Sequence, residues 1–385
     1  MNEEIKILRI STVSHSLQIL LRGQLKFMKS KGMNVSIACS YSPEVCEIEQ
    51  FEEVKYYSIP LSRKLNPGQD IIALFHLIKL IRKLKPDIVH SHSPKAGVVG
   101  MLAARLCNVR LKIHTVAGLP LMETRGWKRK LLIRVEQMTY KCADWVLPNS
   151  INQMDFIKRE ISSDKKIQII GKGSSNGIDL EYFKKSPNYI IERSALRLKY
   201  NINKNDIVLL FVGRLTGYKG VNELVKCFKI LSERFKNLKL LLVGPFETIN
   251  PLESGTIEEI KANHSIISTG HQNDIRPFLN IADIFVFPSY REGFPQSLMQ
   301  ASAYELPCIA SDINGCNEIV FNDYNGYLIP PKNITALVNA CEFLINNPDK
   351  RVALGNKGRE YLVQNFEQRH FWSMLYDFYV TNLNK

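Results

Sequence analysis

Short apolar runs that end in small or polar residues recur along the chain, and amphipathic stretches separate them. In the first half these runs cover residues 5–11, 34–40, 87–92 and 111–118. Apolar runs without polar alternation are typical of strands that are buried on both faces, as in parallel sheets. Because these strands alternate with helical stretches, the sequence predicts an α/β fold with a doubly wound parallel sheet.

The second half repeats this pattern and predicts a second domain of the same kind. Its strands are predicted over 206–215, 239–244 and 282–289, and its helices over 219–235 and from Gln296 onward. The helices of the first half are predicted over 17–30, 71–85, 96–107 and 127–142. We place the domains at 1–185 and 186–365, with a polar linker near 184–204.

Composition narrows the class of protein. Of the 385 residues, 45% are hydrophobic and 23% are charged. This hydrophobic content is enough to bury a core and excludes a mainly disordered chain.

No apolar run reaches about 18 residues, so no transmembrane helix is expected. The first residues are acidic, unlike a secretory signal. The eight cysteines form no CxxC pair and are expected to be reduced and cytosolic.

Positive charge is concentrated in the first half of the chain. Residues 1–185 hold 30 Lys and Arg against 17 Asp and Glu, whereas residues 186–385 hold 21 against 20. A basic half suggests a polyanionic neighbour, either nucleic acid or an anionic membrane surface. The alternative is that the charge serves solubility alone.

Small and charged residues follow the predicted strands, where open α/β sheets bind their ligands. Gly213, Arg214 and Lys219 follow one strand, and the pattern suits a diphosphate held by two cations near a helix N-terminus. Two solvated surface cations would look the same. Glu292 and Gly293 follow another strand just before a helix begins, which places a carboxylate beside free backbone N–H groups; a helix-capping acid is the alternative.

Two further groups of residues have a polar character but a weaker signal. The glycine-rich loop 171–183 around Asn176 either approaches a ligand closely or is a simple exit loop. His90, His92 and His114 lie on or after strands, and the HxH spacing is that of a metal-ligand pair. No third ligand is evident, so a polar role near a cleft is favoured. The sequence contains no Asp-x-Asp motif.

In this order, the motifs resemble the GT-B glycosyltransferases of retaining family 4 over nearly the whole chain. They are HSHSPKAGVVGMLAAR (90–105), HTVAGLP (114–120), VLPNS (146–150), SSNGID (174–179), GRLTGYKG (213–220), PSYREGFPQSLMQA (288–301) and LPCIASDINGCNEIV (306–320). The resemblance implies two Rossmann-like domains, an N-terminal one for the acceptor and a C-terminal one for the nucleotide sugar. It also implies that residues 366–385 pack back on the N-terminal domain.

The resemblance assigns roles to individual residues. Arg214 and Lys219 hold the diphosphate, Glu292 lies at the sugar, and His114 lies near the acceptor and the reacting sugar. The remaining donor contacts are Gly213, Gly293, Phe294, Pro295 and Gln296, His271 beside the base in TGHQNDI (269–275), Gln300 at the ribose, and Asn176. Gln300 stands where the family has a second glutamate, and residues 13–18 lack the family's glycine pair.

The reaction implied is a metal-independent transfer of a hexose or N-acetylhexosamine with retention. The donor expected is a UDP-sugar, and the acceptor is a lipid-diphosphate-linked glycan at the cytoplasmic face of the cell membrane. Residues 127–133, with Arg63 and Lys64, are candidates for contact with that surface, although 127–133 also suits an ordinary core helix. No cofactor or nucleic acid is expected. The alternatives are a GT-B sugar-nucleotide epimerase or hydrolase, and a degenerate nucleotide-sugar scaffold or sensor.

Overall fold

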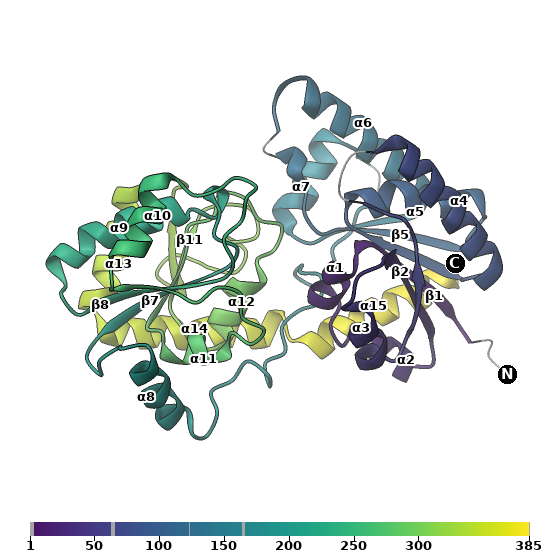
Figure 1. Ribbon diagram of the computed structural model, residues 1–385. Coiled ribbons are helices and arrows are strands. Elements are labelled where there is room, and N and C mark those ends of the chain that lie inside the picture. Colours follow the sequence, from purple (N-terminus) through teal and green to yellow (C-terminus); the bar gives the residue numbers. More distant parts are fainter. Residues whose placement is uncertain (1–3, 63–65, 123, 164–165, 385) are drawn as a thin grey trace. The chain divides into compact units, whose positions relative to one another are not determined.

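The computed structural model describes residues 4–62, 66–122, 124–163 and 166–384 (Figure 1). The chain forms two compact units. It leaves the first unit after Gly177 and returns to it at Gln368, and the residues from Ile178 to Glu367 form the second unit. None of the described helices is long and apolar enough to cross a membrane.

Each unit is built on a six-stranded parallel sheet, as the sequence predicts. The first sheet has the order β3-β2-β1-β4-β5-β6 and the second the order β12-β11-β10-β7-β8-β9. The strands of the first sheet are β1 (Lys6–Val13), β2 (Asn34–Ser40), β3 (Lys55–Ser58), β4 (Ile88–His92), β5 (Leu111–Val116) and β6 (Trp145–Pro148). Those of the second are β7 (Ile207–Val212), β8 (Leu238–Val243), β9 (Ile266–Ser268), β10 (Ile284–Phe287), β11 (Cys308–Ser311) and β12 (Gly326–Ile329).

Helices cover both sheets, and the central strands are buried because their side chains are apolar on both faces. In the first unit they are α1 (Ser14–Leu20), α2 (Gln24–Ser30), α3 (Val45–Glu52), α4 (Pro67–Leu84), α5 (Pro94–Leu106), η1 (Pro120–Met122), α6 (Gly126–Cys142), α7 (Ile151–Glu160) and α15 (Gln368–Leu383). In the second they are α8 (Tyr189–Lys199), η2 (Gly217–Lys219), α9 (Val221–Arg234), α10 (Ser254–Ala262), α11 (Arg276–Ile281), α12 (Gln296–Ala303), α13 (Ile334–Asn346) and α14 (Pro348–Asn365).

The helix predicted over 17–30 is interrupted, and its interruption has a packing cause. Helix α1 ends at Leu20 and α2 begins at Gln24, with Gly23 between them at φ +80°. A Cβ atom at Gly23 would lie 2.6 Å from the Trp372 ring of α15. The break therefore lets α15 pack against the first unit, where Phe371, Leu375 and Phe378 are buried.

The predicted boundary at 185/186 and the predicted linker near 184–204 need correction. The boundary lies at 177/178, because Ile178, Leu180 and Phe183 pack into the core of the second unit. Ile178 N–H also donates to the Phe366 carbonyl at 2.8 Å. Residues 189–199 form α8 and are not a linker.

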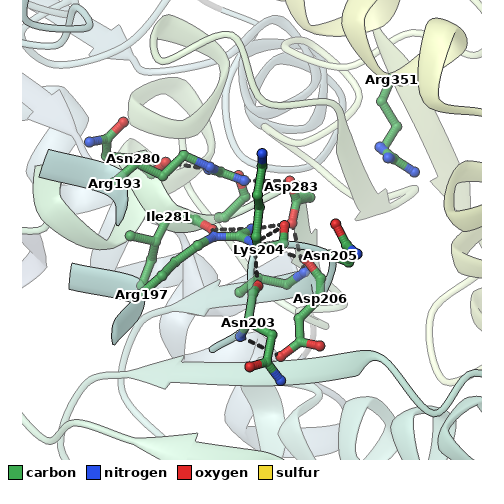
Figure 2. A network of polar contacts seen from close by, with 12 residues as sticks. Arg193, Arg197, Asn203, Lys204, Asn205, Asp206, Asn280, Ile281, Asp283 and Arg351 are labelled. Carbon is green, nitrogen blue, oxygen red and sulfur yellow. Dashed lines mark hydrogen bonds and ion pairs between the residues drawn. The ribbon is translucent and has the colours of Figure 1, made fainter. Parts of the chain in front are cut away.

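Two arginines on α8 attach this helix to the second sheet (Figure 2). The Arg197 side chain is 6% exposed, and its guanidinium lies 2.7 Å from the Asp283 carboxylate. The same guanidinium donates hydrogen bonds to four backbone carbonyls, those of Ile281, Asn203, Lys204 and Asp206. Arg193 contacts the same carboxylate at 2.6 Å. Asp283 in turn accepts from Val208 N–H at 2.8 Å, at the start of β7. The network thus joins α8 to the amino ends of β7 and β10.

Candidate active site

The order of the second sheet reverses between β7 and β10. Strands β8 and β9 lie on one side of this pair, and β11 and β12 on the other. In open α/β sheets the loops at the carboxyl ends of such a pair separate and leave a crevice for a ligand. The residues that follow β7 and β10 are therefore the candidate site within this unit.

The loop after β7 is joined to the loop after β10 by close backbone contacts. Tyr290 N–H donates to the Tyr218 carbonyl at 2.8 Å. Gly220 adopts φ +70°, and a Cβ atom there would lie 2.0 Å from the Pro288 carbonyl oxygen. Only glycine fits this position, both for its backbone angle and for the space available. The contact fixes Lys219, the preceding residue, beside the end of β10.

Lys219 and Glu292 form an ion pair at the centre of the site. Lys219 Nζ lies 2.6 Å from Glu292 Oε1, and the two side chains are 19% and 11% exposed. The Ser289 hydroxyl donates to the same oxygen at 2.6 Å, and the ammonium lies 5.1 Å from the centre of the Phe287 ring. These contacts orient the pair, and both side chains remain partly exposed.

Asn314 positions the turn that carries Glu292, and the sequence reasoning did not identify it. Its side-chain amide donates to the carbonyls of Glu292 and Gly293 at 2.9 and 3.0 Å. Gly315, at φ +77°, allows this approach, since a Cβ atom there would lie 2.4 Å from the Gly293 oxygen. The Asn-Gly dipeptide was a turn signal that could have suggested this role.

Helix α12 begins directly after this turn, so its N-terminal end lies at the same edge of the sheet. Pro295 is its N-cap, and Gln296 and Gln300 are four residues apart, which places both half-buried side chains on one face. The Phe294 side chain is buried, and its ring centre lies 5.3 Å from that of Phe366. Only the backbone of residue 294 can therefore face a ligand.

Arg214 and His271 lie in the second unit but outside the Lys219–Glu292 pair. The Arg214 side chain is 54% exposed and lies 3.6 Å from Glu247, a partner that sequence reasoning missed. Gly213, just before it, donates its N–H to Val243. His271 is exposed on the loop after β9, with Nε2 3.2 Å from Asn273. The structure therefore brings Lys219 and Glu292 together and leaves the other two side chains open to solvent.

His114 and Asn176 belong to the first unit, and both side chains are buried. Burial lowers the pKa of His114 to about 4. Its Nδ1 lies 2.8 Å from the Ser91 hydroxyl, and a Cβ atom at Gly97 of α5 would lie 2.4 Å from its ring. The Asn176 side-chain oxygen accepts hydrogen bonds from Gln24 and from the Trp372 ring N–H, and its side-chain nitrogen donates to the Arg22 carbonyl. Both side chains therefore make polar contacts inside this unit, and their predicted roles near the ligands stay predictions.

His90 and His92 take part in a buried polar cluster of the first unit. The Arg9 guanidinium donates to His92, Gln24 and Tyr379, and His90 contacts the Tyr379 hydroxyl. Burial, followed by the Arg9 charge, holds the pKa of both histidines well below its usual range. Within the described ranges no three His, Cys, Asp or Glu side chains are grouped as metal ligands.

The arrangement in the second unit suits a phosphorylated sugar donor. A lysine ammonium and the N-terminal end of α12 favour a diphosphate, and the Glu292 carboxylate can accept hydrogen bonds from sugar hydroxyls. The loop 269–275 follows β9, and His271 and Asn273 are its exposed residues.

Comparisons with known proteins show which family the chain is similar to. The model of "Glycosyltransferase Family 4" matches residues 20–182, and that of "Glycosyl transferases group 1" matches residues 192–361. The capsular polysaccharide biosynthesis glycosyltransferase CapM of Staphylococcus aureus is 32% identical over 99% of this chain and 98% of its own length.

Another relative and a solved structure extend the likeness. An Escherichia coli UDP-Gal:alpha-D-GlcNAc-diphosphoundecaprenol alpha-1,3-galactosyltransferase is 30% identical over 82% of this chain and 81% of its own length. The crystal structure of HepE from Anabaena in complex with UDP-glucose has a TM-score of 0.82 at 16% identity, covering 98% of this chain and all of that one. The chain therefore belongs to the family 4 (group 1) glycosyltransferases and has the GT-B fold.

Proposed function

We propose that this chain transfers a hexose or N-acetylhexosamine from a nucleotide sugar to a hydroxyl of a growing glycan carried on a lipid diphosphate, with retention at the anomeric carbon. The observation that carries the proposal is the partly buried Lys219–Glu292 pair beside the N-terminal end of α12. A cation and a carboxylate lie where the strand order reverses between β7 and β10. They match the diphosphate and the sugar of a sugar diphosphate.

UDP is the proposed nucleotide. The name of the E. coli relative gives UDP-Gal as its donor, and the Anabaena neighbour was solved in complex with UDP-glucose. The loop 269–275, in which His271 is exposed, is the proposed contact for the base, and Gln300 is the proposed contact for the ribose. An amide at residue 300 still accepts and donates hydrogen bonds, so ribose binding does not require the carboxylate.

The chemical step is proposed to be electrostatic. Negative charge grows on the leaving diphosphate, where the Lys219 ammonium and the backbone N–H groups of α12 stabilise it. The contact of Arg214 with Glu247 is long and exposed, so it contributes little free energy. The Arg214 side chain can therefore rotate to contact the diphosphate as well. The acceptor proton passes to the leaving phosphate oxygen. We propose that no metal is needed, since basic side chains supply the charge and the sequence lacks the Asp-x-Asp motif.

The acceptor side is proposed to lie at the inner face of the cell membrane. The E. coli relative is named for a diphosphoundecaprenol-linked acceptor. On α6 of the basic first unit, Trp127, Leu131 and Met138 are 71%, 53% and 49% exposed and share one helical face with Arg134. Lys128 and Lys130 flank them, and each basic residue near an anionic surface contributes about 1 kcal/mol. Arg63 and Lys64 lie outside the described residues.

A thermal-shift panel of UDP, GDP, ADP, CMP and their sugar conjugates tests the donor first. A nucleotide that binds the folded state raises the melting temperature, and we expect this from UDP and one UDP-sugar. Lys219→Ala should abolish most turnover and weaken UDP binding in calorimetry. The matched control is Lys226→Ala, whose side chain pairs with Glu253 on the surface of the same unit. Normal turnover in Lys219→Ala would remove the second unit's site from the proposal.

The remaining parts of the proposal have separate tests. NMR of the product gives the anomeric outcome, and turnover after dialysis against EDTA should persist. A folded protein that binds no nucleotide would favour the scaffold alternative, which Gln300 supports. For the membrane, Trp127→Glu with Leu131→Glu should reduce sedimentation with phosphatidylglycerol vesicles, while Val352→Glu, at an exposed site on α14, should not. Equal sedimentation of both variants would exclude the α6 face.

A further inference from the structure

The second cation of the candidate site, Arg214, is paired with a carboxylate from a different loop than the first. Arg214 Nη1 lies 3.6 Å from Glu247 Oε1, and the two side chains are 54% and 27% exposed. Glu247 follows β8, whereas Glu292, the partner of Lys219, follows β10. Strand β7 lies between β8 and β10 in the sheet. The two cations are therefore paired with carboxylates that follow strands on opposite sides of β7.

Backbone hydrogen bonds hold the loop that carries Glu247 against the loop after β7. Leu215 N–H donates to the Pro245 carbonyl at 2.8 Å, and Glu247 N–H donates to the Leu215 carbonyl at 3.4 Å. Asn250 accepts hydrogen bonds from two backbone N–H groups of the β7 loop, at 2.9 and 2.7 Å. None of these bonds involves the Arg214 side chain. The fold therefore places the Glu247 carboxylate beside Arg214 whether or not their ion pair forms.

The two ion pairs differ in strength. The Lys219–Glu292 contact is 2.6 Å long and largely buried, and the Ser289 hydroxyl supports it. The Arg214–Glu247 contact is longer and more exposed. An exposed pair changes an equilibrium constant by at most about fivefold, the equivalent of about 1 kcal/mol. Arg214 is therefore the cation that can change partners at low cost.

We propose that Glu247 is a positioning residue that keeps Arg214 beside the loop after β8 until the donor diphosphate replaces the carboxylate. The carboxylate and the phosphate oxygens compete for one guanidinium, which binds either group through charge-assisted hydrogen bonds. Donor binding then exchanges one ion pair for another, so the apparent affinity is reduced by the fraction of Arg214 that is held. The inference rests on the proposed function, because it requires a diphosphate at this site.

Calorimetry of UDP binding to the full-length protein tests the exchange. Glu247→Gln removes the competing charge and keeps the size of the side chain, so it should bind UDP about two- to fivefold more tightly than the wild type. Glu247→Asp keeps the charge and should stay closer to the wild type. The matched control is Glu259→Gln on α10, because Glu259 is 22% exposed and lies 3.4 Å from Lys229. This variant removes the same charge from a similar pair, and its UDP affinity should equal that of the wild type.

A double-mutant cycle shows whether Glu247 acts through Arg214. Arg214→Gln should bind UDP more weakly, and the addition of Glu247→Gln should bring no gain, with UDP raised to concentrations that saturate the weaker variants. No gain in Glu247→Gln, an equal gain in Glu259→Gln, or a gain that persists in the Arg214→Gln background would each overturn the inference. The proposed function would survive those results if the wild type binds UDP and Lys219→Ala weakens that binding. A folded wild type that binds no UDP would remove both.

Discussion

The network at Asp283 predicts a loss of stability that is confined to one unit. In Asp283→Ala the Arg197 guanidinium, 6% exposed, loses its counter-charge, and Arg193 and Val208 N–H lose a partner. Removing one member of a buried ion pair costs about 3–5 kcal/mol. Arg197 keeps its bonds to backbone carbonyls, and the Asp283 side chain is 20% exposed, so we expect about 3 kcal/mol.

Urea unfolding can resolve this loss because the tryptophans are placed unequally. All three, Trp127, Trp145 and Trp372, lie in the first unit, so their fluorescence follows that unit alone. Circular dichroism follows both units. With a urea dependence of about 2 kcal/mol/M, Asp283→Ala should move the second unit's midpoint down by about 1.5 M. The fluorescence midpoint should stay in place.

The control is Glu360→Ala on α14, whose carboxylate is 49% exposed and lies 2.7 Å from Lys357. An exposed pair contributes about 0–1 kcal/mol, so both midpoints should stay close to wild type. A fluorescence shift as large as the circular dichroism shift in Asp283→Ala would refute the reasoning, since it would mean that the two units unfold as one. An unchanged circular dichroism transition would show that the network adds no stability.

Four other changes test the site and the first unit. Glu292→Gln should lower kcat strongly while calorimetry still detects UDP, because Lys219 loses its orienting partner but keeps its charge; unchanged kcat would contradict this. Gln300→Glu should keep or improve UDP affinity, and a large loss in calorimetry would assign residue 300 another role. Gly220→Ala should weaken UDP binding and lower the melting temperature, because its φ of +70° and the Pro288 carbonyl leave no space for Cβ; a melting temperature equal to wild type would count against that contact. The folded-state pKa of His114, about 4, lies below its ordinary value, so its stabilisation is complete above pH 6.5 and is lost as pH falls toward 4, by up to about 3 kcal/mol. His114→Gln should therefore show a flatter fall of unfolding free energy over that range, and an identical pH profile would refute this.

Sequence patterns were sufficient for the central strands and for the fold class, whereas the short edge strands β3, β9 and β12 were not predicted. The central strands are apolar on both faces. A continuous apolar run is visible in the local sequence, so these strands can be predicted without knowledge of the tertiary structure. Helix α8 was missed for the opposite reason. Its apolar residues are interrupted by charged ones, and Ile190, Ile191 and Leu198 are exposed. Arg193 and Arg197 acquire their role only from Asp283, which lies far along the chain.

In the candidate site, too, local features were predictable from the sequence and long-range contacts were not. Glycines and charged residues after β7 and β10 were visible in the sequence, whereas the bonds of Asn314 to the Glu292 turn were not. His114 and Asn176 were assigned by resemblance to places near the ligands. Their burial depends on α5 and α15, which pack over them from other parts of the chain.

The discontinuous first unit has a consequence for biosynthesis. The ribosome produces its sheet early, but α15, which buries Phe371, Trp372 and Tyr379 against that unit, follows the whole of the second unit. At about 5–20 residues per second, some 190 residues of translation take about 10–40 s. During that interval an apolar surface that includes Leu25 and Met28 lacks its cover. The later unit can therefore reach its native state before the earlier one, and the nascent chain offers chaperones a defined binding surface until α15 emerges.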